Sequence, residues 1–194
     1  MRQLVLVALL AALAVFAQAD TVPALTLIPP SGDVSSVPGS VVGWGFNVTY
    51  TAPADWVVLT GSEFTGSTVY GNYVDYLSSP TNAPFYVVGP SPESSTLTGL
   101  WNPSSTPLSG LGEFDINPTA LPGVSIPGDI VVHYSVFSGD PNDPNFNPFT
   151  ETVVPDATIS APVDVVVTPE PAALFPVAVM LLAFAGSRVR RGIV

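Results

Sequence analysis

The segment 138–151, SGDPNDPNFNPFTE, contains the densest set of side chains that could bind a ligand. Hard cations such as calcium prefer oxygen ligands, and this segment is rich in carboxylate and amide oxygens. The EF-hand pattern is not met, because Pro144 breaks the ligand spacing and no glycine sets the sharp turn. Asn, Asp and Pro are also ordinary turn residues, so the sequence favours a plain loop over a calcium site. The oxygen donors are Asp140, Asn142, Asp143 and Asn145, followed by Asn147 and Glu151.

Catalytic groups are scarce. His133 is the one histidine, and it lies in a strand-like stretch with no nucleophile motif such as G-x-S-x-G in the chain. Glu113 and Asp115 are two residues apart and therefore share a strand face, as a glycosidase carboxylate pair would, but nothing nearby distinguishes them from a solvated face. There is no cysteine, which excludes thiol catalysis and zinc–thiolate sites. We therefore predict no catalytic residues, no required cofactor and a protein that is not an enzyme.

The charge distribution is strongly uneven. All fifteen Asp and Glu residues lie between Asp20 and Glu170, and this stretch has no Lys or Arg, so its formal charge is −15. The four arginines are confined to the two ends of the chain. A body without cations has no means of neutralising phosphate, so we expect no nucleic-acid partner. We also expect the body to form no internal salt bridge.

Hydrophobic residues in the body alternate with a period of two, and 22 Pro and 16 Gly interrupt them. This pattern predicts seven to nine short strands packed as an all-β, antiparallel β-sandwich, either Ig-like or jelly-roll-like. In the clearest strand, 42–50, Trp44, Phe46, Val48 and Tyr50 share one face. The other candidate strands are 25–28, 56–60, 68–77, 85–88, 95–101, 112–117, 129–137 and 157–167.

The middle of the chain is rich in aromatic residues, which could form a carbohydrate-binding face or fill the core. The body has no disulfide to supplement its core, so we favour core filling. These residues are Trp56, Tyr70, Tyr73, Tyr76, Phe85, Tyr86 and Trp101.

Residues 1–19 have the pattern of a secretory signal peptide, which would form a short N-terminal helix. Arg2 precedes an apolar core, and Ala17-Gln18-Ala19 matches an A-x-A cleavage site for signal peptidase. Cleavage there would leave residues 20–167 as one β-sandwich domain. The alternative is an uncleaved membrane helix.

Residues 168–194 form a tail with three parts in a fixed order. The triplet Pro169-Glu170-Pro171 is followed by the uncharged run 172–187 and then by Arg188, Arg190 and Arg191. As a helix the run would be roughly 24 Å long, slightly short of a bilayer core, and the arginines would stay on the cytoplasmic side. The physical pattern thus predicts a C-terminal transmembrane helix with the body outside.

This tail resembles a PEP-CTERM sorting signal, on the triplet, the apolar helix and the terminal arginine cluster. The resemblance covers only about the last 27 residues, and Pro176 within the helix departs from it. It implies a Gram-negative exporter, recognition by an exosortase, cleavage near the triplet, and delivery to the cell surface or extracellular matrix. An ordinary single-span anchor is the alternative.

Together these observations predict an exported, non-enzymatic surface or matrix protein. It would be held in the inner membrane transiently by its C-terminal helix, with exosortase and signal peptidase as processing enzymes and exopolysaccharide as a candidate partner. The alternative function is a carbohydrate- or calcium-binding surface module. The activity of the β domain itself is not encoded in any motif that we recognise.

Overall fold

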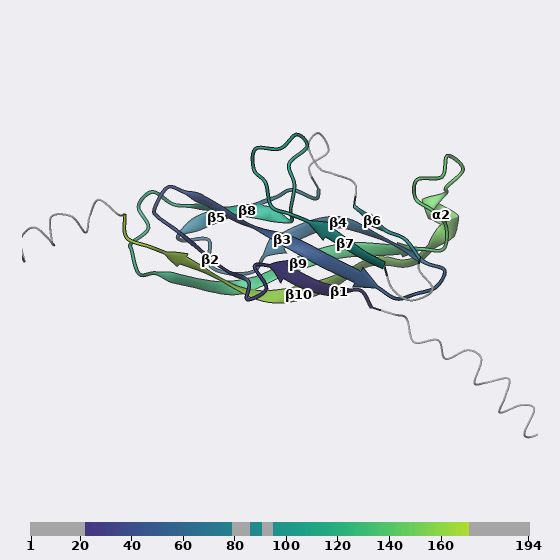
Figure 1. Cartoon of the computed structure of the whole chain (residues 1–194), viewed down its shortest axis with the longest axis horizontal. Helices are drawn as coiled ribbons and strands as arrows, with labels where there is room; N and C mark the ends of the chain where they lie inside the picture. Colours follow the sequence, from purple (N-terminus) through teal and green to yellow (C-terminus); the bar gives the residue numbers. More distant parts are fainter. Residues whose placement is uncertain (1–21, 79–85, 91–94, 171–194) are drawn as a thin grey trace, which may run out of the picture.

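The computed structural model describes residues 22–78, 86–90 and 95–170, which form a sandwich of two five-stranded sheets (Figure 1). The first sheet contains β1 (Ala24–Ile28), β3 (Val41–Tyr50), β5 (Gly71–Asp75), β7 (Ser95–Gly99) and β8 (Gly112–Ile116). The second contains β2 (Asp33–Ser36), β4 (Trp56–Phe64), β6 (Val87–Val88), β9 (Ser125–Phe137) and β10 (Thr152–Val167). A single short helix of the described residues, α2 (Pro148–Glu151), lies between β9 and β10.

The strand order is that of the immunoglobulin fold. If β1, β3, β4, β5, β8, β9 and β10 are taken as strands A to G, the first sheet has the order A-B-E-D and the second contains G-F-C. This order distinguishes between the two sandwiches that the sequence allowed, in favour of the Ig-like one. The expectation of antiparallel pairing holds except at β2, which pairs parallel with β10.

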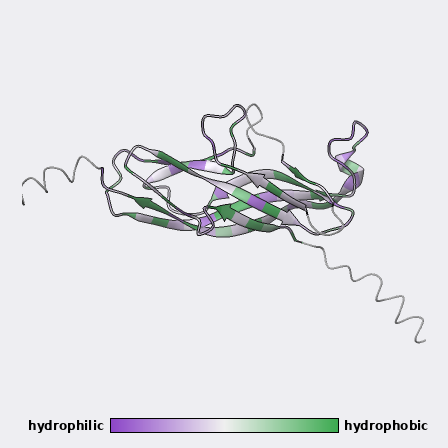
Figure 2. Cartoon of the chain, viewed as in Figure 1, coloured by the Kyte–Doolittle hydropathy of each residue, from purple (hydrophilic) through white to green (hydrophobic). Residues whose placement is uncertain are grey.

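The core lies between the sheets, where the alternation of the sequence predicted it. On β3 the buried side chains are the predicted Trp44, Phe46, Val48 and Tyr50 together with Val42, and on β8 they are Phe114 and Ile116. On β9 the buried side chains are Ile130, Val132, Tyr134 and Val136. Figure 2 shows hydrophobic and hydrophilic segments alternating along the strands, as expected when one face of each sheet packs inward.

Trp44 connects the centre of the core to the turn between β1 and β2. Its side chain is fully buried, and its Nε1 donates a hydrogen bond of 2.7 Å to the carbonyl oxygen of Gly32. Gly32 has φ +76°, and a Cβ there would lie 2.3 Å from the carbonyl oxygen of Pro162 on β10. Only glycine fits this position without strain. The turn is therefore fixed against both sheets where the chain crosses from one to the other.

Several strand boundaries differ from the predicted ones for physical reasons. β2 was missed because its residues, DVSS, have no apolar alternation. β10 begins at Thr152 rather than 157, with register shifts that place Asp156 at φ 42°. β9 begins at Ser125, and Pro127 lies within it opposite Asp164. Prolines and a bulge interrupt the apolar alternation in these segments, so the sequence pattern did not predict the full length of the strands.

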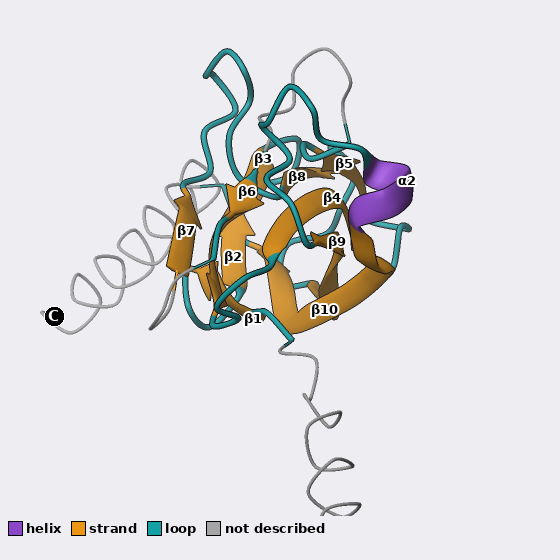
Figure 3. Cartoon of the chain, turned by 90° about the vertical axis from the view of Figure 1, so that its right-hand side faces the viewer, coloured by secondary structure: helices purple, strands orange, loops and turns teal. Residues whose placement is uncertain are grey.

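The described chain begins and ends at opposite ends of the sandwich (Figure 1). β10 runs from α2 at one end to Val167 at the other, and Figure 3 views the molecule from the end at which α2 lies. Within residues 22–78, 86–90 and 95–170, no helix is long and apolar enough to cross a membrane. The predicted signal helix, with Ala17 and Ala19, and the predicted C-terminal helix lie outside these residues.

Candidate functional site

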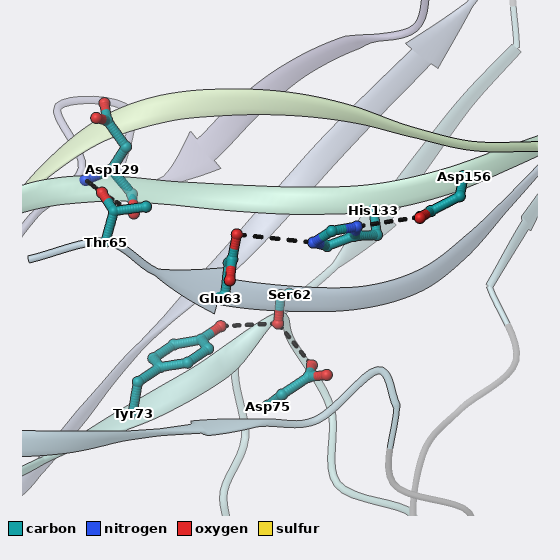
Figure 4. Close-up of polar contacts among 8 residues, drawn as sticks. All are labelled: Ser62, Glu63, Thr65, Tyr73, Asp75, Asp129, His133 and Asp156. Atoms are coloured by element: carbon teal, nitrogen blue, oxygen red, sulfur yellow. Dashed lines mark hydrogen bonds and ion pairs between the residues drawn. The ribbon is translucent and has the colours of Figure 1, made fainter.

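Two polar clusters lie near each other around β4 (Figure 4). The inner cluster is centred on Ser62, a buried side chain that is 7% exposed. Its Oγ lies 2.8 Å from the Tyr73 hydroxyl, 2.6 Å from Oδ1 of Asp75 and 2.7 Å from the carbonyl oxygen of Leu111. The Ser62 hydroxyl has one proton, and the oxygens of Asp75 and Leu111 both act as its acceptors. No Ser62 proton is left for Tyr73, so the Tyr73 hydroxyl donates to Ser62. The cluster joins β4 of the second sheet to β5 of the first.

The carboxylate of Asp75 also accepts two backbone hydrogen bonds. Its Oδ1 also accepts from the backbone N–H of Leu77 at 2.8 Å, and its Oδ2 accepts from that of Ser78 at 3.2 Å. A nucleophilic serine needs an adjacent base and access for a substrate. Ser62 is buried and its neighbours are a carboxylate, a phenol and a carbonyl, so the arrangement suits a connection between the sheets rather than catalysis.

We expect Ser62→Ala to lower the free energy of unfolding by about 1–3 kcal/mol, because Tyr73 and Asp75 each lose a buried partner. Urea unfolding of the purified protein measures this. Ser160→Ala is the matched control, since Ser160 is exposed on β10, and should change the value by less than about 0.5 kcal/mol. Equal effects of the two substitutions would contradict a structural role for the cluster.

Two tyrosines, one in this cluster and one near it, have raised pKa values. Burial raises the pKa of Tyr73 above its usual range, and the neighbouring Asp75 carboxylate adds to the shift. Burial likewise raises the pKa of Tyr76, whose hydroxyl donates to Oε2 of Glu113. Glu113 thus accepts a hydrogen bond from Tyr76. Both tyrosines are kept in the neutral form by their surroundings.

The outer cluster comprises Glu63, His133 and Asp156 from β4, β9 and β10. The Nδ1 atom of His133 lies 3.2 Å from Oδ1 of Asp156, and its Nε2 lies 3.7 Å from Oε1 of Glu63. The bulge in β10 supports this arrangement, because the backbone N–H of Asp156 donates to Oγ of Ser135 at 3.3 Å. The expectation that the body forms no internal salt bridge is therefore wrong when His133 is protonated.

This cluster is accessible to solvent. The side chain of His133 is 34% exposed, and the two carboxylates are 59% and 78% exposed. A general base must have one ring nitrogen available for a substrate or nucleophile. Nδ1 faces Asp156, and Nε2 faces Glu63 from beyond hydrogen-bond distance. That His133 is structural or solvent-facing stays a prediction. Exposed pairs of this kind contribute little to stability.

The predicted calcium ligands lie in the loop between β9 and β10. Oδ1 of Asp140 accepts from the backbone and side-chain nitrogens of Asn142, and Oδ1 of Asp143 accepts from those of Asn145. In the described part of the chain no three His, Cys, Asp or Glu side chains are grouped closely enough to hold a metal ion. Turn hydrogen bonds account for these residues. The calcium site stays a prediction, which a calorimetric titration with calcium tests.

The aromatic residues of the middle section are buried or half-buried where they are described, and some of them fill the core as the favoured interpretation predicted. Trp56, Tyr76 and Trp101 do not belong to the core between the sheets. Tyr76 is 1% exposed, Tyr86 packs edge-on against Phe46 at 5.0 Å, and Tyr70 and Tyr73 pack on the core. Trp101 lies directly over Gly43 of β3, where an added Cβ would be 2.3 Å from its Nε1. Phe85 lies outside the described residues.

The start of the sorting tail is described. Pro169 and Glu170 are exposed and follow the end of β10 at Val167. Pro171 and the basic residues Arg188, Arg190 and Arg191 lie outside the described residues.

Comparison with known proteins gave only distant structural matches. No protein-family model matches the sequence, and no curated protein matches it. WR4, a C. elegans MSP family member, matches with 12% identity and a TM-score of 0.33 over 74% of this chain and 97% of that one. The sixth cohesin of Acetivibrio cellulolyticus scaffoldin B, solved with a Cel5 dockerin mutant, matches with 12% identity and a TM-score of 0.24 over 75% and 98%. Similarity at this level carries no functional argument, so the Ig-like assignment rests on the strand order.

Proposed function

We propose that the protein is an exported, non-enzymatic β-sandwich that is displayed at the cell surface or in the extracellular matrix. Its tail, residues 168–194, is the sorting signal that an exosortase recognises and cuts. The observation that carries the proposal is the exposure of Pro169 and Glu170, which leave the body directly after β10. A processing enzyme would therefore reach Pro169 and Glu170 without unfolding the sandwich.

The composition of the two ends supports export. Arg2 and the apolar stretch before Ala19 match a secretory signal, and the three terminal arginines match the cytoplasmic end of a transient membrane segment. Once both ends are removed, the product carries no Lys or Arg. Such a chain is repelled by anionic lipid surfaces and has no basic patch that would hold it there.

The described polar clusters support a non-enzymatic role. Ser62 is buried and serves as a link between sheets, and both ring nitrogens of His133 face carboxylates. Among the described residues, neither cluster pairs an accessible nucleophile with a base. A display or binding module needs neither, which is why this function is preferred.

Export is tested with tail variants expressed in a bacterium that contains an exosortase. We expect Glu170→Ala and the triple change Arg188→Ser, Arg190→Ser and Arg191→Ser to leave an uncut chain in the inner membrane. Asp33→Ala is the matched control because it removes an exposed carboxylate from β2, and it should be processed like the wild type. Fractionation with an antibody against the body measures the result. Equal processing of all variants would contradict a sorting role for the tail.

A further inference from the structure

We propose that the end of the sandwich at which α2 lies is a docking surface for a partner protein segment with an aliphatic side chain next to Lys or Arg. The surface comprises the turn before β4, the start of β10 and the loop 138–151. Strand pairing brings these parts together, because Phe137 at the end of β9 is paired with Trp56 on one side and Thr152 on the other. This inference does not depend on how the tail is processed.

An apolar pocket of about 220 Å³ opens at this end. Its lining includes Tyr134 and Val136 from β9, and Val153 and Val154 from β10, with the carboxylate residue Asp55 among them. Small-molecule sites are usually larger, at about 300–1,000 Å³. The pocket therefore suits a single aliphatic side chain rather than a cofactor.

Apolar side chains around the pocket are exposed. Phe149 on α2 is 96% exposed, Val22 is 66% exposed and Val153 is 47% exposed. Val22 and Val153 also line the pocket, whereas Phe149 does not. Scattered single residues of this kind are normal on protein surfaces, but a cluster next to an apolar pocket is typical of a binding site. A docked segment would cover these side chains.

The loop that carries Phe149 is held in place before any partner binds. Phe146 packs edge-on against Phe137 at 5.1 Å, which fixes the loop to β9. Asn147 caps α2 by accepting from the N–H of Phe149, and Glu151 accepts from the N–H of Asn147 at 2.9 Å. Because the loop backbone is already ordered, binding a partner would cost little conformational entropy in the loop.

Charge complementarity identifies the partner. Asp55 lines the pocket, and the adjoining loop contributes Asp140, Asp143 and Glu151 around a second, polar hollow. The body offers no Lys or Arg to neutralise them. A second copy of the chain would bring like charges together, whereas a segment with Lys or Arg would place opposite charges at the rim. A basic partner segment is therefore the occupant that this surface fits.

Peptide display tests this surface. The purified full chain, immobilised, is used to select binders from a library of random peptides. We expect the selected peptides to combine Leu, Ile or Val with a neighbouring Lys or Arg. The affinity of a selected synthetic peptide should fall by about tenfold or more in Asp55→Lys and in Val153→Ser, both of which alter the lining of the pocket. Raising the salt concentration should weaken its binding to the wild type.

The controls carry the same chemical changes at the opposite end of the sandwich. Asp33→Lys and Leu121→Ser alter an exposed carboxylate and an exposed leucine that lie away from the pocket, so binding should be unchanged. Circular dichroism and melting curves confirm that all four variants fold. Selection of no peptides, or of acidic peptides, would overturn the proposal. So would equal losses in the variants and controls, or self-association of the chain through this end.

Discussion

Replacing Trp44 with alanine is expected to lower the free energy of unfolding by about 3–5 kcal/mol, the largest stability effect that we predict for one substitution. The indole is fully buried, lies 6.4 Å from the ring of Phe64 and 6.3 Å from that of Tyr73, and makes the hydrogen bond to Gly32. Removing it leaves a cavity between the sheets and a carbonyl oxygen without its partner. Urea unfolding followed by circular dichroism measures the change.

Two further substitutions test how much of this loss comes from the cavity and how much comes from the lost hydrogen bond. Trp44→Phe retains an aromatic ring but removes the donor to Gly32, so it should cost less than the alanine change. Leu121→Ala removes a side chain that is 68% exposed, and it should cost less than about 0.5 kcal/mol. A Trp44→Ala protein as stable as the Leu121→Ala protein would contradict the central place of Trp44 in the core.

The second large effect is a loss of stability at alkaline pH. The pKa values of Tyr73 and Tyr76 are raised in the folded protein, whereas unfolded tyrosine titrates near pH 10. Above that pH the unfolded chain has released protons that the folded protein still holds, so the free energy of unfolding falls as pH rises. Each tyrosine contributes about 1.4 kcal/mol per pH unit, so the two together contribute about 2.8 kcal/mol per pH unit.

Few other side chains of the protein titrate in the pH range of this measurement. The chain has no Lys and no Cys, so tyrosines are the side chains of the body that titrate in this range. Unfolding in urea from about pH 8 to about pH 11.5 gives the slope, and tyrosinate absorbance gives the titration. Burial also raises the pKa of Tyr134, which adds to the slope in the same direction. Tyr76→Phe should therefore lower the slope by about 1.4 kcal/mol per pH unit without abolishing it. A free energy of unfolding that stays constant over this range would show that the two tyrosines are not held neutral.

The fold was predictable where apolar alternation was regular. In β3, Trp44, Phe46 and Val48 identify the buried face from the sequence alone, and the same is true of Phe114 in β8. Strands whose formation depends on pairing rather than on side-chain pattern were not predictable. The polar strand β2 exists because it pairs in parallel with Val165 and its neighbours on β10, and no local feature of its sequence predicts that.

The polar clusters were not predictable because they join residues far apart in the chain. Ser62 and Asp75 belong to different sheets, and Leu111 joins them from 49 residues beyond Ser62. Similarly, a register shift in β10 brings Asp156 to His133. In the sequence, His133 stood out as the one histidine, but nothing there indicated which carboxylates lie next to it. The loop of the predicted calcium site was correctly located as a connection between strands.

The intact mass of the mature protein, measured together with its cell fraction, tests the central claim most directly. We predict a product that begins at Asp20, ends near Pro169 to Pro171, and is found at the cell surface or outside the cell. Its mass would then correspond to a body with no Lys or Arg. A protein that still carries Arg188, Arg190 and Arg191 and stays in the inner membrane would contradict sorting and would identify the tail as a permanent anchor.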